Sequence, residues 1–456
     1  MLSWYLLLLL AVICLNYKSI ESKEVSSLRG SEEVEDEEHP VHVQTQTEQP
    51  TYTVGAYYYP WHTNNFHNGQ GYLRRKLDPP QYPTLGEYDD TDPDVIAQHL
   101  KWSRYANINL WVASWWGPNI HTDGTLKNVI LPHPDMNGMK IALFYETTGR
   151  ISIAKQTNVE DVFYNDVKYI AKTYFDDPNY MRIDGRPVLF LYVTRNFYDQ
   201  WQPSWLFGPS ELEEITTRMR QAAMENGGHD LYIVGDQVWG DAPIMGEEYE
   251  PFTLLDAVTN YDVYGSIAAQ DGYAGLDRVN DLMSRYADWK EDANLGGCAF
   301  IPGIAPGYND RTVRTGNPAL SRKLYEGAEE GSLFRTSLEK SLELTNQSTG
   351  NLIMITSWNE WHEDTQIEPV VIGQPKDPPL GTTCYNGPCD EGLEYKAYGE
   401  LYLDIVRNVT SPTAMKDDVF HNSIEETETL KVEDTDMSYS TTETNSNEDP
   451  LFIELV

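Results

Sequence analysis

The sequence is poor in basic residues, with 33 lysines and arginines against 71 aspartates and glutamates and a formal net charge of −38. This excess repels phosphate backbones and anionic membrane surfaces, which argues against nucleic-acid binding and favours a neutral or cationic ligand. Part of the charge lies near the chain ends, in residues 23–50 and 413–456, which contain few large apolar groups. We expect both segments to be disordered, because they bury too little surface to offset the entropy of ordering.

The apolar run WYLLLLLAVICL at residues 4–15 is too short to cross a hydrocarbon core of ~30 Å comfortably. It matches the apolar region of a secretory signal, so residues 1–22 are predicted to be a signal peptide. An uncleaved anchor is the alternative, because no lysine or arginine precedes the run and no clear small-x-small cleavage site follows it. Both interpretations predict the secretory pathway, with a secreted or Golgi-lumenal domain and membrane attachment only through an anchor. Sequons at Asn346 and Asn408 agree with glycosylation there.

Cysteine is scarce, with four residues in the chain. Cys14 lies in the apolar run and Cys298 stands alone, whereas Cys384 and Cys389 enclose the turn-forming sequence YNGP. A small loop disulfide is therefore expected between the last two. Metal binding is the lesser alternative, because no second pair of cysteines or histidines with ligand spacing is visible, and no metal or other cofactor is expected. The histidines considered for a metal site were His62, His67, His99, His121 and His362.

From residue 54 onward, short runs rich in β-branched and aromatic residues alternate with stretches whose apolar residues recur every three or four positions. Strands that are apolar on nearly every residue, each followed by a helix, indicate a parallel sheet covered on both faces. Strands are expected at 54–59, 108–115, 140–146, 187–193, 231–236, 254–261, 298–303 and 351–358, and helices include 92–107, 159–175, 210–228 and 320–344.

Eight such strands favour a single α/β domain with a closed (β/α)8 barrel over residues 51–412. A doubly wound open sheet is the alternative, but no glycine-rich phosphate loop follows the first strand, so no nucleotide cofactor is expected. Asp92 and Ser210 are predicted to cap helices, and Gly227 with Gly228 to end one. No internal repeat is evident.

Chemistry in such a barrel gathers at the carboxyl ends of the strands. Tyrosine, tryptophan and carboxylates accumulate at six of the eight expected ends, a combination that suits a neutral, polyhydroxylated ligand such as a sugar. The alternative is that these aromatic groups only plug the barrel mouth. The six ends read YYYPWH, SWWGP, YETTGR, NYDVYG, GIAPGY and SWNEWHE.

The stretch SWNEWHEDTQIEP, at residues 357–369, carries the sharpest signal. Glycosidic cleavage typically uses two carboxyl groups that flank the bond, and Glu360 and Glu363 lie three residues apart just past the eighth strand. Crowding the two carboxylates, and shielding them with Trp358 and Trp361, should raise the pKa of one of them into the range of a usable acid. The alternative is that both are solvated loop residues.

These motifs resemble the endo-α-mannosidases of glycoside hydrolase family 99, secretory-pathway or secreted enzymes with a (β/α)8 barrel. The resemblance extends over roughly residues 52–408 and is strongest in SWNEWHEDTQIEP. It also includes YYYPW, YPTLGEYDDTDPDVIAQHL, ASWWGP, FYETTGR, NDVKYI and FIPGIAPGYND, in the family's order.

The resemblance implies a role for each glutamate. Glu363 corresponds to the general acid that protonates the leaving sugar and then activates water. Glu360 corresponds to the base that takes the proton of the mannose 2-hydroxyl, so that the sugar's own oxygen forms a 1,2-anhydro intermediate and the configuration is retained. The implied substrate-binding residues are Tyr59, Trp61, Trp115, Trp116, Glu146, Tyr261, Tyr308 and Trp358.

Two departures from the family bear on specificity. The segment after Trp61 reads HTNNFHNGQGYLRRKLDPPQ in place of the vertebrate WYGNP segment, and Asp364 stands where the family usually has glycine. If its side chain pointed inward, Asp364 should raise the pKa of Glu363 further. The substrate is therefore expected to be an α-mannosyl N-glycan, a mannan or another α-linked polysaccharide.

Two other functions remain open on the sequence. One is a carbohydrate-binding barrel that has lost catalysis, and the other is a polysaccharide-assembly protein that shares the NEWxE motif. The presence of both glutamates argues against the first, and the lack of a nucleotide-phosphate loop argues against the second.

Overall fold

The computed structural model describes residues 51–411, except 64–65, 67–70, 155–158, 198–209, 244–249, 268–271, 315–316, 375–381 and 385–386. The predicted signal or anchor, the acidic linker and the acidic tail lie outside the described residues, as does Cys14. Within the described ranges, no helix combines the length and apolar character needed to cross a membrane.

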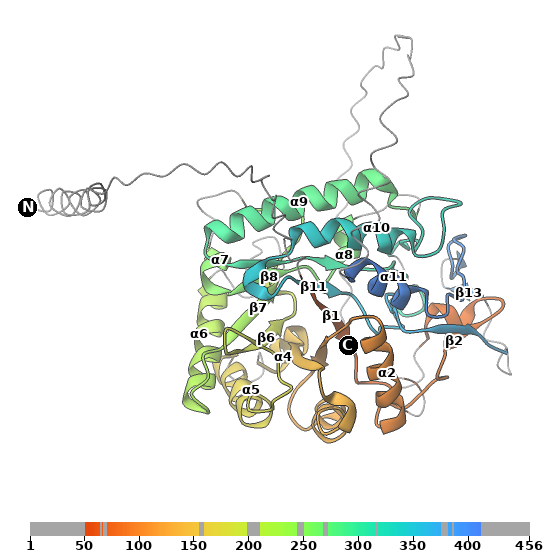
Figure 1. Ribbon diagram of the computed structural model, residues 1–456. Helices are drawn as coiled ribbons and strands as arrows, with labels where there is room; N and C mark the ends of the chain where they lie inside the picture. The colour runs from red at the N-terminus through yellow and green to blue at the C-terminus, as the bar shows by residue number, and fades with distance from the viewer. Residues whose placement is uncertain are drawn as a thin grey trace, which may run out of the picture. The chain divides into compact units, whose positions relative to one another are not determined.

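A parallel sheet forms the centre of the fold, and its strand order around the barrel is β10-β11-β1-β3-β4-β6-β7-β8-β9 (Figure 1). Each neighbouring pair on this path is parallel. The strands are β1 (Thr53–Tyr58), β3 (Leu110–Trp115), β4 (Lys140–Tyr145), β6 (Arg186–Leu191), β7 (Tyr232–Asp236), β8 (Ala257–Thr259), β9 (Ala299–Ile301), β10 (Gly303–Ile304) and β11 (Leu352–Ile355).

The sheet closes through a strand that is interrupted at Pro302. β9 pairs with β8, and β10 pairs with β11. Only Pro302 separates the two segments, and proline has no N–H to donate to a ladder, so the pairing breaks there. Counting β9 and β10 as one strand position gives the eight positions that the sequence predicts. The (β/α)8 barrel is confirmed, and the open doubly wound sheet is wrong.

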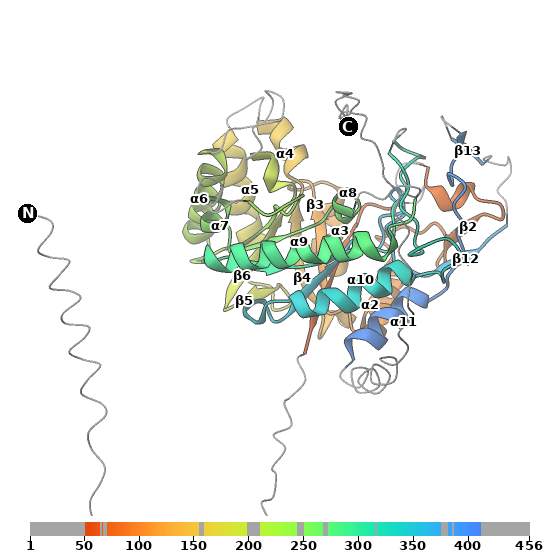
Figure 2. The same cartoon turned by 90° about the horizontal axis from the view of Figure 1, so that it is seen from above.

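Helices lie around this sheet, with α5 and α6 on one side and α9 and α10 on another in both views (Figures 1 and 2). Asp92 caps α2 as predicted, because its carboxylate accepts the backbone N–H of Asp94. Gly228, with a φ of +70°, follows the end of α6. The longer helices are α2 (Pro93–Tyr105), α5 (Val159–Thr173), α6 (Ser210–Glu225), α9 (Gly275–Leu295), α10 (Ser332–Ser341) and α11 (Leu401–Thr410).

The remaining helical segments are short and lie in the connections. They are η1 (Leu73–Lys76), α3 (His121–Thr125), η2 (Leu126–Ile130), η3 (Pro134–Met136), α4 (Thr147–Ala154), η4 (Thr194–Phe197), α7 (Glu250–Leu254), α8 (Val263–Ile267), η5 (Leu342–Leu344) and η6 (Gln347–Thr349).

The prediction of one helix over 320–344 is wrong in its first half. Gly327 and Gly331 have φ values of +82° and +80°, which a helix does not accommodate, and α10 begins only at Ser332. Before it, Arg322 is buried in a non-helical segment. This buried arginine pairs with Asp364.

Side chains alternate across the barrel wall. On β3, Leu110 and Val112 belong to the cluster inside the barrel, whereas Trp111, Ala113 and Trp115 belong to the cluster between the sheet and the helices. This is the two-residue period of a β-strand. It decides which residues at the strand ends face the barrel mouth.

Three small pairings complete the fold. Strand β5 (Arg182–Ile183) pairs antiparallel with β6, β2 (Gln81–Pro83) with β12 (Val370–Ile372), and β13 (Thr383–Cys384) with β14 (Gly387–Pro388). β2, β12 and β13 lie together at one side of the barrel, far from α6, in both views (Figures 1 and 2). The expected Cys384–Cys389 disulfide is present, with a Cα–Cα distance of 4.9 Å, and Cys298 is a buried thiol.

Candidate active site

The carboxyl ends of the barrel strands carry tyrosines and carboxylates that continue the inward-facing positions. Tyr59 follows Tyr57 of β1, Glu146 follows Phe144 of β4, and Tyr192 follows Phe190 of β6, in each case two residues on. Asp236 ends β7, and Tyr261 lies two residues past β8. Strand alternation therefore brings these five side chains to one end of the barrel.

The connection after β11 carries Glu360 and Glu363 and is fixed by Asn359. The Asn359 Oδ1 accepts the backbone N–H of Tyr59 at 2.8 Å, and its Nδ2 donates to the backbone carbonyl of Tyr59 at 3.0 Å. A further anchor is Trp361, whose indole N–H donates to the buried Glu368 carboxylate at 2.8 Å. The connection forms turns here, not the helical turn considered from the spacing.

Glu360 is buried and is held by backbone contacts. Its own N–H donates to the Ser357 hydroxyl at 2.8 Å, and its Oε1 accepts the N–H of His362 at 3.0 Å. Burial raises the pKa of Glu360 well above its ordinary value, and the neighbouring charge of Glu363 raises it further. This carboxyl is a strong base once it has lost its proton.

Glu363 makes an ion pair with Arg314, with 2.8 Å between Oε1 and Nη1. Its side chain keeps 17% of its surface exposed, whereas Glu360 is almost fully enclosed. Burial raises the pKa of Glu363, and Arg314 opposes this without cancelling it. Arg314 also contacts Asp310, at 3.1 Å, and lies 3.4 Å from the Tyr308 hydroxyl.

Glu146 is the third glutamate at this end of the barrel, and it is buried. The Ser114 hydroxyl donates to its Oε1 at 2.6 Å, and the indole N–H of Trp116 donates to the same hydroxyl at 2.9 Å. Burial raises the pKa of Glu146 to about 8, so it is largely protonated at neutral pH. The Trp116 ring is half-buried and packs against Gly149, where a Cβ would lie 2.9 Å from the ring.

Tyr59 and Tyr261 meet through their hydroxyl groups above the barrel interior. Both hydroxyls feel the charges of Glu360 and Glu363, and burial raises the pKa of each tyrosine, so both remain neutral hydrogen-bond partners. The backbone N–H of Tyr261 donates to the Asp236 carboxylate at 2.9 Å, which fixes the strand end. The half-buried Trp61 ring lies 4.4 Å from that of Tyr59.

Tyr308 lies on the Arg314 side of the site. Its ring stacks on Tyr264 with 4.1 Å between centroids and a 9° interplanar angle, and its hydroxyl donates to Asp310 at 2.8 Å. The charge of Glu363 adds to burial in raising the pKa of Tyr308, which places the phenol near the carboxylate.

Trp115 and Trp358 are not brought to this site, contrary to the expectation that both bind substrate. Trp115 occupies one of the outward-facing positions of β3, like Trp111 and Ala113, and its indole N–H donates to the Asp123 carboxylate at 3.0 Å. Trp358 is 0% exposed and lies against Trp111 in the layer between sheet and helices. Trp361 belongs to the same layer, so the expected shielding of the glutamates by indoles is also wrong. Neighbouring tyrosines surround the glutamates instead.

Asp364 does not face Glu363 either. Its carboxylate bonds with Arg74 at 2.6 Å and with Arg322 at 3.0 Å, and these arginines hold the pKa of Asp364 below its usual range despite its burial. Asp364 was expected to raise the pKa of Glu363 only if the Asp364 side chain pointed inward. This condition is not met. The φ of Asp364 is +50°, a conformation that glycine adopts without strain and that aspartate tolerates better than most residues.

Four residues of the site escaped the sequence interpretation: Arg314, Asn359, Tyr192 and Asp236. The last two end the fourth and fifth strands, the two ends that were left out of the count of six, so all eight ends carry tyrosine, tryptophan or a carboxylate. A strict two-residue alternation would have found them. Arg314 had no such signal, because it reaches Glu363 from a loop 49 residues away.

No group of three or more metal-ligating side chains occurs among the described residues. A cavity of about 300 Å³ lies beside α8 and is lined partly by Trp239, Arg278 and Arg285, away from the glutamates. Its two arginines donate to the carbonyls of Ile267 and Ser266, near the end of α8. Glu146, Glu360 and Glu363 lie instead at the barrel end where the strand-end tyrosines meet, and burial raises the pKa of each.

Comparison with protein families adds an independent finding. The model of "Glycosyl hydrolase family 99" matches residues 42–380 of this chain, which include Glu146, Glu360 and Glu363.

The chain is also similar to known proteins, at low sequence identity. The "Glycoprotein endo-alpha-1,2-mannosidase" of Rattus norvegicus is 25% identical over 391 residues, covering 78% of this chain and 74% of the relative. The "Glycoprotein endo-alpha-1,2-mannosidase-like protein" of Mus musculus is 26% identical over 355 residues, covering 74% and 67%. The solved family 99 endo-alpha-mannosidase of Bacteroides thetaiotaomicron has a TM-score of 0.53 at 23% identity, covering 81% of this chain and 98% of that one. This last likeness concerns the fold.

Proposed function

Because this chain belongs to glycosyl hydrolase family 99, we propose that it is a retaining, endo-acting enzyme that cleaves internal α-mannosidic bonds in N-glycans or mannans. Membership in the family makes it a glycoside hydrolase. The α-mannosyl specificity is proposed because the rat relative is a glycoprotein endo-α-1,2-mannosidase. High-mannose N-glycans and mannans are both neutral, as the charge of the chain favours.

The observation that carries the proposal is the pair Glu360 and Glu363 at the carboxyl end of β11, both with raised pKa values and each held in a different way. Glu363 is partly exposed and can reach a leaving oxygen or water, whereas Glu360 is enclosed beneath the tyrosine hydroxyls. Such a division suits one carboxyl that exchanges protons with the leaving group and another that acts on the sugar itself.

In the first step that we propose, Glu360 takes the proton of the mannose 2-hydroxyl, and the freed oxygen attacks the anomeric carbon. Glu363 gives its proton to the glycosidic oxygen, the bond to the leaving sugar breaks, and a 1,2-anhydro sugar forms with inversion. A raised pKa makes Glu360 basic enough for this role, and the same property keeps a proton on Glu363.

In the second step, the Glu363 carboxylate takes a proton from water as the water oxygen attacks the anomeric carbon. The bond from that carbon to the 2-oxygen breaks, and Glu360 returns its proton to the 2-oxygen. The second inversion restores the starting configuration, and both glutamates regain their first protonation states. In this step the Arg314 contact supports Glu363, because it stabilises the carboxylate form.

The other residues are proposed to bind the sugar. Neutral Glu146 can donate a hydrogen bond to a hydroxyl, and the paired hydroxyls of Tyr59 and Tyr261 face the same charges. Trp61 and Trp116 are the half-buried aromatic rings suited to stacking on sugar C–H surfaces. Tyr308, beside Arg314, is proposed to line the leaving-group side.

The test is product analysis with the full-length protein on a panel of α-mannans and high-mannose N-glycans. We expect internal cleavage, a first-formed product with the α configuration by ¹H NMR, and a loss of about 10²- to 10⁴-fold in kcat for Glu363→Gln. A mannoside that lacks the 2-hydroxyl should resist cleavage.

Cleavage of the 2-deoxy substrate at the normal rate with retention would replace the anhydro route by attack of a carboxylate on the anomeric carbon. Binding of glycans without any cleavage across the panel would favour the carbohydrate-binding barrel. Transfer to an acceptor sugar without hydrolysis would favour the polysaccharide-assembly protein.

A further inference from the structure

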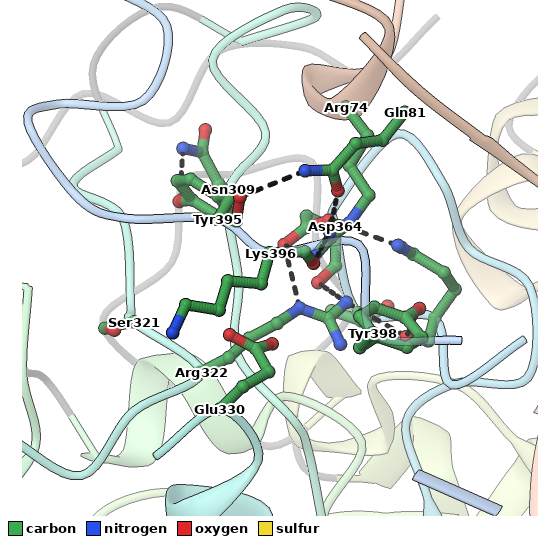
Figure 3. Close-up of polar contacts among 12 residues, drawn as sticks. Arg74, Gln81, Asn309, Ser321, Arg322, Glu330, Asp364, Tyr395, Lys396 and Tyr398 are labelled. Carbon is green, nitrogen blue, oxygen red and sulfur yellow. Dashed lines mark hydrogen bonds and ion pairs between the residues drawn. The ribbon is translucent and has the colours of Figure 1, made fainter. Parts of the chain in front are cut away.

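The residue next to Glu363 is enclosed between two buried arginines that come from distant parts of the chain. Arg74 lies on η1, after β1, and its Nε and Nη2 donate to the two oxygens of the Asp364 carboxylate at 2.6 and 3.4 Å. Arg322 lies between β10 and α10, and its Nε donates to Oδ2 at 3.0 Å. All three side chains are about 1% exposed (Figure 3).

Each arginine also contacts groups other than Asp364. Arg74 donates to Gln81 at 2.5 Å and to the carbonyl of Lys396 at 3.0 Å. Its guanidinium also lies 4.8 Å from the ring centroid of Tyr398. Arg322 lies 5.1 Å from the same ring centroid, so Tyr398 is shared by both cations (Figure 3).

The arginines bond the backbone as well as the Asp364 carboxylate; these two arginines and Asp364 are called the clamp here. Arg322 Nη2 donates to the carbonyl of Asp364 at 2.7 Å and to that of Gln366 at 2.9 Å. The carbonyl of Glu363 accepts the N–H of Asn309 at 2.7 Å, and the Asn309 side chain donates to Tyr395. The peptide before Asp364 is therefore bonded to Asn309, and the peptide after it is bonded to Arg322.

Asp364 has a φ of +50°, and this left-handed residue sets the direction in which the chain passes Glu363. Charge-assisted bonds from two guanidinium groups to its carboxylate can hold an aspartate in that conformation. No other carboxylate of the described residues forms an ion pair with Arg74 or Arg322. Among the described residues, Asp364 is thus the carboxylate that bonds both arginines, while Glu330 adds a more distant negative charge near Arg322.

From this geometry we propose that Asp364 is a positioning residue: the Arg74–Asp364–Arg322 clamp fixes the backbone beside Glu363 and so directs its carboxyl toward Arg314 and the reacting bond. The inference rests on the proposed role of Glu363 as acid and base. It adds three charged residues to the groups that determine the rate, and these residues act through the backbone beside Glu363.

The test compares kcat, KM and the pH dependence of kcat/KM on an α-mannan for wild type, Asp364→Asn and Arg74→Lys. Asparagine tolerates a positive φ and keeps the size of the side chain but removes its charge. Lysine keeps the charge of Arg74 but cannot bond both oxygens at once. Misplacement of a reacting group by about 1 Å can cost ~10²-fold, so we expect kcat to fall about 10- to 100-fold with little change in KM.

The direction of the pH shift separates positioning from simple charge removal. Groups that face Glu363 include Arg314, Asp310, Asp262 and Glu360. If Glu363 moves away from Arg314, its pKa rises, and the alkaline limb of kcat/KM moves to higher pH. Loss of a nearby negative charge, acting through space alone, would move that limb to lower pH.

Asp256→Asn is the matched control. Asp256 also lies between two arginines, with 2.7 Å to Arg186 and 2.6 Å to Arg220, but it immediately precedes β8 at the opposite end of the strand from Tyr261. This variant should lose stability while keeping the wild-type kcat and pH profile.

Two results would overturn the inference: folded Asp364→Asn with wild-type kcat and pH profile, or Asp256→Asn with the same kinetic defect. If Asp364→Asn does not fold, Arg74→Lys decides by the same criteria. Glu363→Gln, measured in parallel, separates the two proposals, because full activity of that variant contradicts the proposed function itself. A crystal structure of Asp364→Asn gives a readout that needs no activity, and retention of the Glu363–Arg314 contact there contradicts positioning.

Discussion

At the scale of single residues, three glutamates face one end of the barrel, and each is held by a different kind of partner. Glu146 accepts from a hydroxyl, Glu360 accepts from a backbone N–H, and Glu363 accepts from a guanidinium. These partners differ in charge, so the three carboxyls differ in how readily they lose a proton. The proposed roles of acid, base and neutral donor require such a difference.

Arg314→Gln should shift the pH dependence of the reaction. Arg314 lowers the pKa of Glu363, so its removal raises that pKa and keeps the proton on the acid to higher pH. We expect the alkaline limb of kcat/KM to move to higher pH, measured on one α-mannan from pH 5 to 10. Arg311→Gln, which removes an arginine paired with Glu391 instead, is the control and should leave the limb in place.

Glu146→Gln should change how stability depends on pH. The folded protein keeps the Glu146 proton up to a pKa of about 8, whereas the unfolded chain loses it near the ordinary value of 4.5. Unfolding therefore releases a proton between these values, and stability falls with rising pH by at most about 1.4 kcal/mol per unit. The variant lacks this contribution, so urea unfolding from pH 5 to 8 should give a flatter curve. Parallel curves for variant and wild type would show that Glu146 is ionised when folded.

Alternation along strands explains which residues could be predicted and which could not. In β3, Ser114 faces the barrel interior and Trp115 the helices, a distinction that the two-residue period already contains. The expectation that Trp115 stacks on a sugar did not take this alternation into account. Trp358 is different, because the chain leaves strand geometry after Ile355 and the period no longer applies.

At the scale of elements, the eight strands were predictable because each is a short apolar run between turn signals. The helix over 320–344 was predicted too long because its spacing was read through Gly327 and Gly331. The positive φ values of both glycines are incompatible with a helix. The segment before them buries Arg322 and Lys323, and a pattern of apolar residues does not predict that charged residues are buried. Contacts between distant loops, such as Arg314 with Glu363, depend on the closed barrel and lie beyond local patterns.

Asn359→Ala tests how strongly the connection after β11 is tied to β1. The substitution removes both bonds to the Tyr59 backbone and one to the Tyr88 hydroxyl, at 3.2 Å, and leaves buried polar groups without partners. We expect a loss of about 1–3 kcal/mol in the free energy of unfolding and a lower kcat, since Glu360 is the next residue. Unfolding in urea and steady-state kinetics provide the two measurements.

Asn346→Ala is the control for that experiment. Asn346 caps η6, before β11, where its side chain accepts the N–H of Ser348. Its loss should cost about 1 kcal/mol of stability and leave kcat unchanged. Equal kinetic effects of the two substitutions would mean that the Asn359 bonds have no special part in the site.

At the scale of the whole molecule, the net charge of −38 sets what can approach the barrel. A neutral mannan should be cleaved with a kcat/KM that changes by less than about twofold as NaCl is raised, because no long-range attraction assists binding. A phosphorylated or sulfated mannan should be a poorer substrate, and the difference should shrink as salt screens the repulsion. Faster cleavage of the anionic polymer at low salt would mean that a local basic surface outweighs the net charge.

The clamp around Asp364 also constrains how this sequence could have arisen or could be redesigned. Two buried cations without an anion, or an anion without its cations, are each strongly destabilising. We therefore expect charge-removing replacements at positions 74, 322 and 364 to have non-additive effects on stability. A chimera that grafts this catalytic loop onto a homologous scaffold must transfer all three positions together.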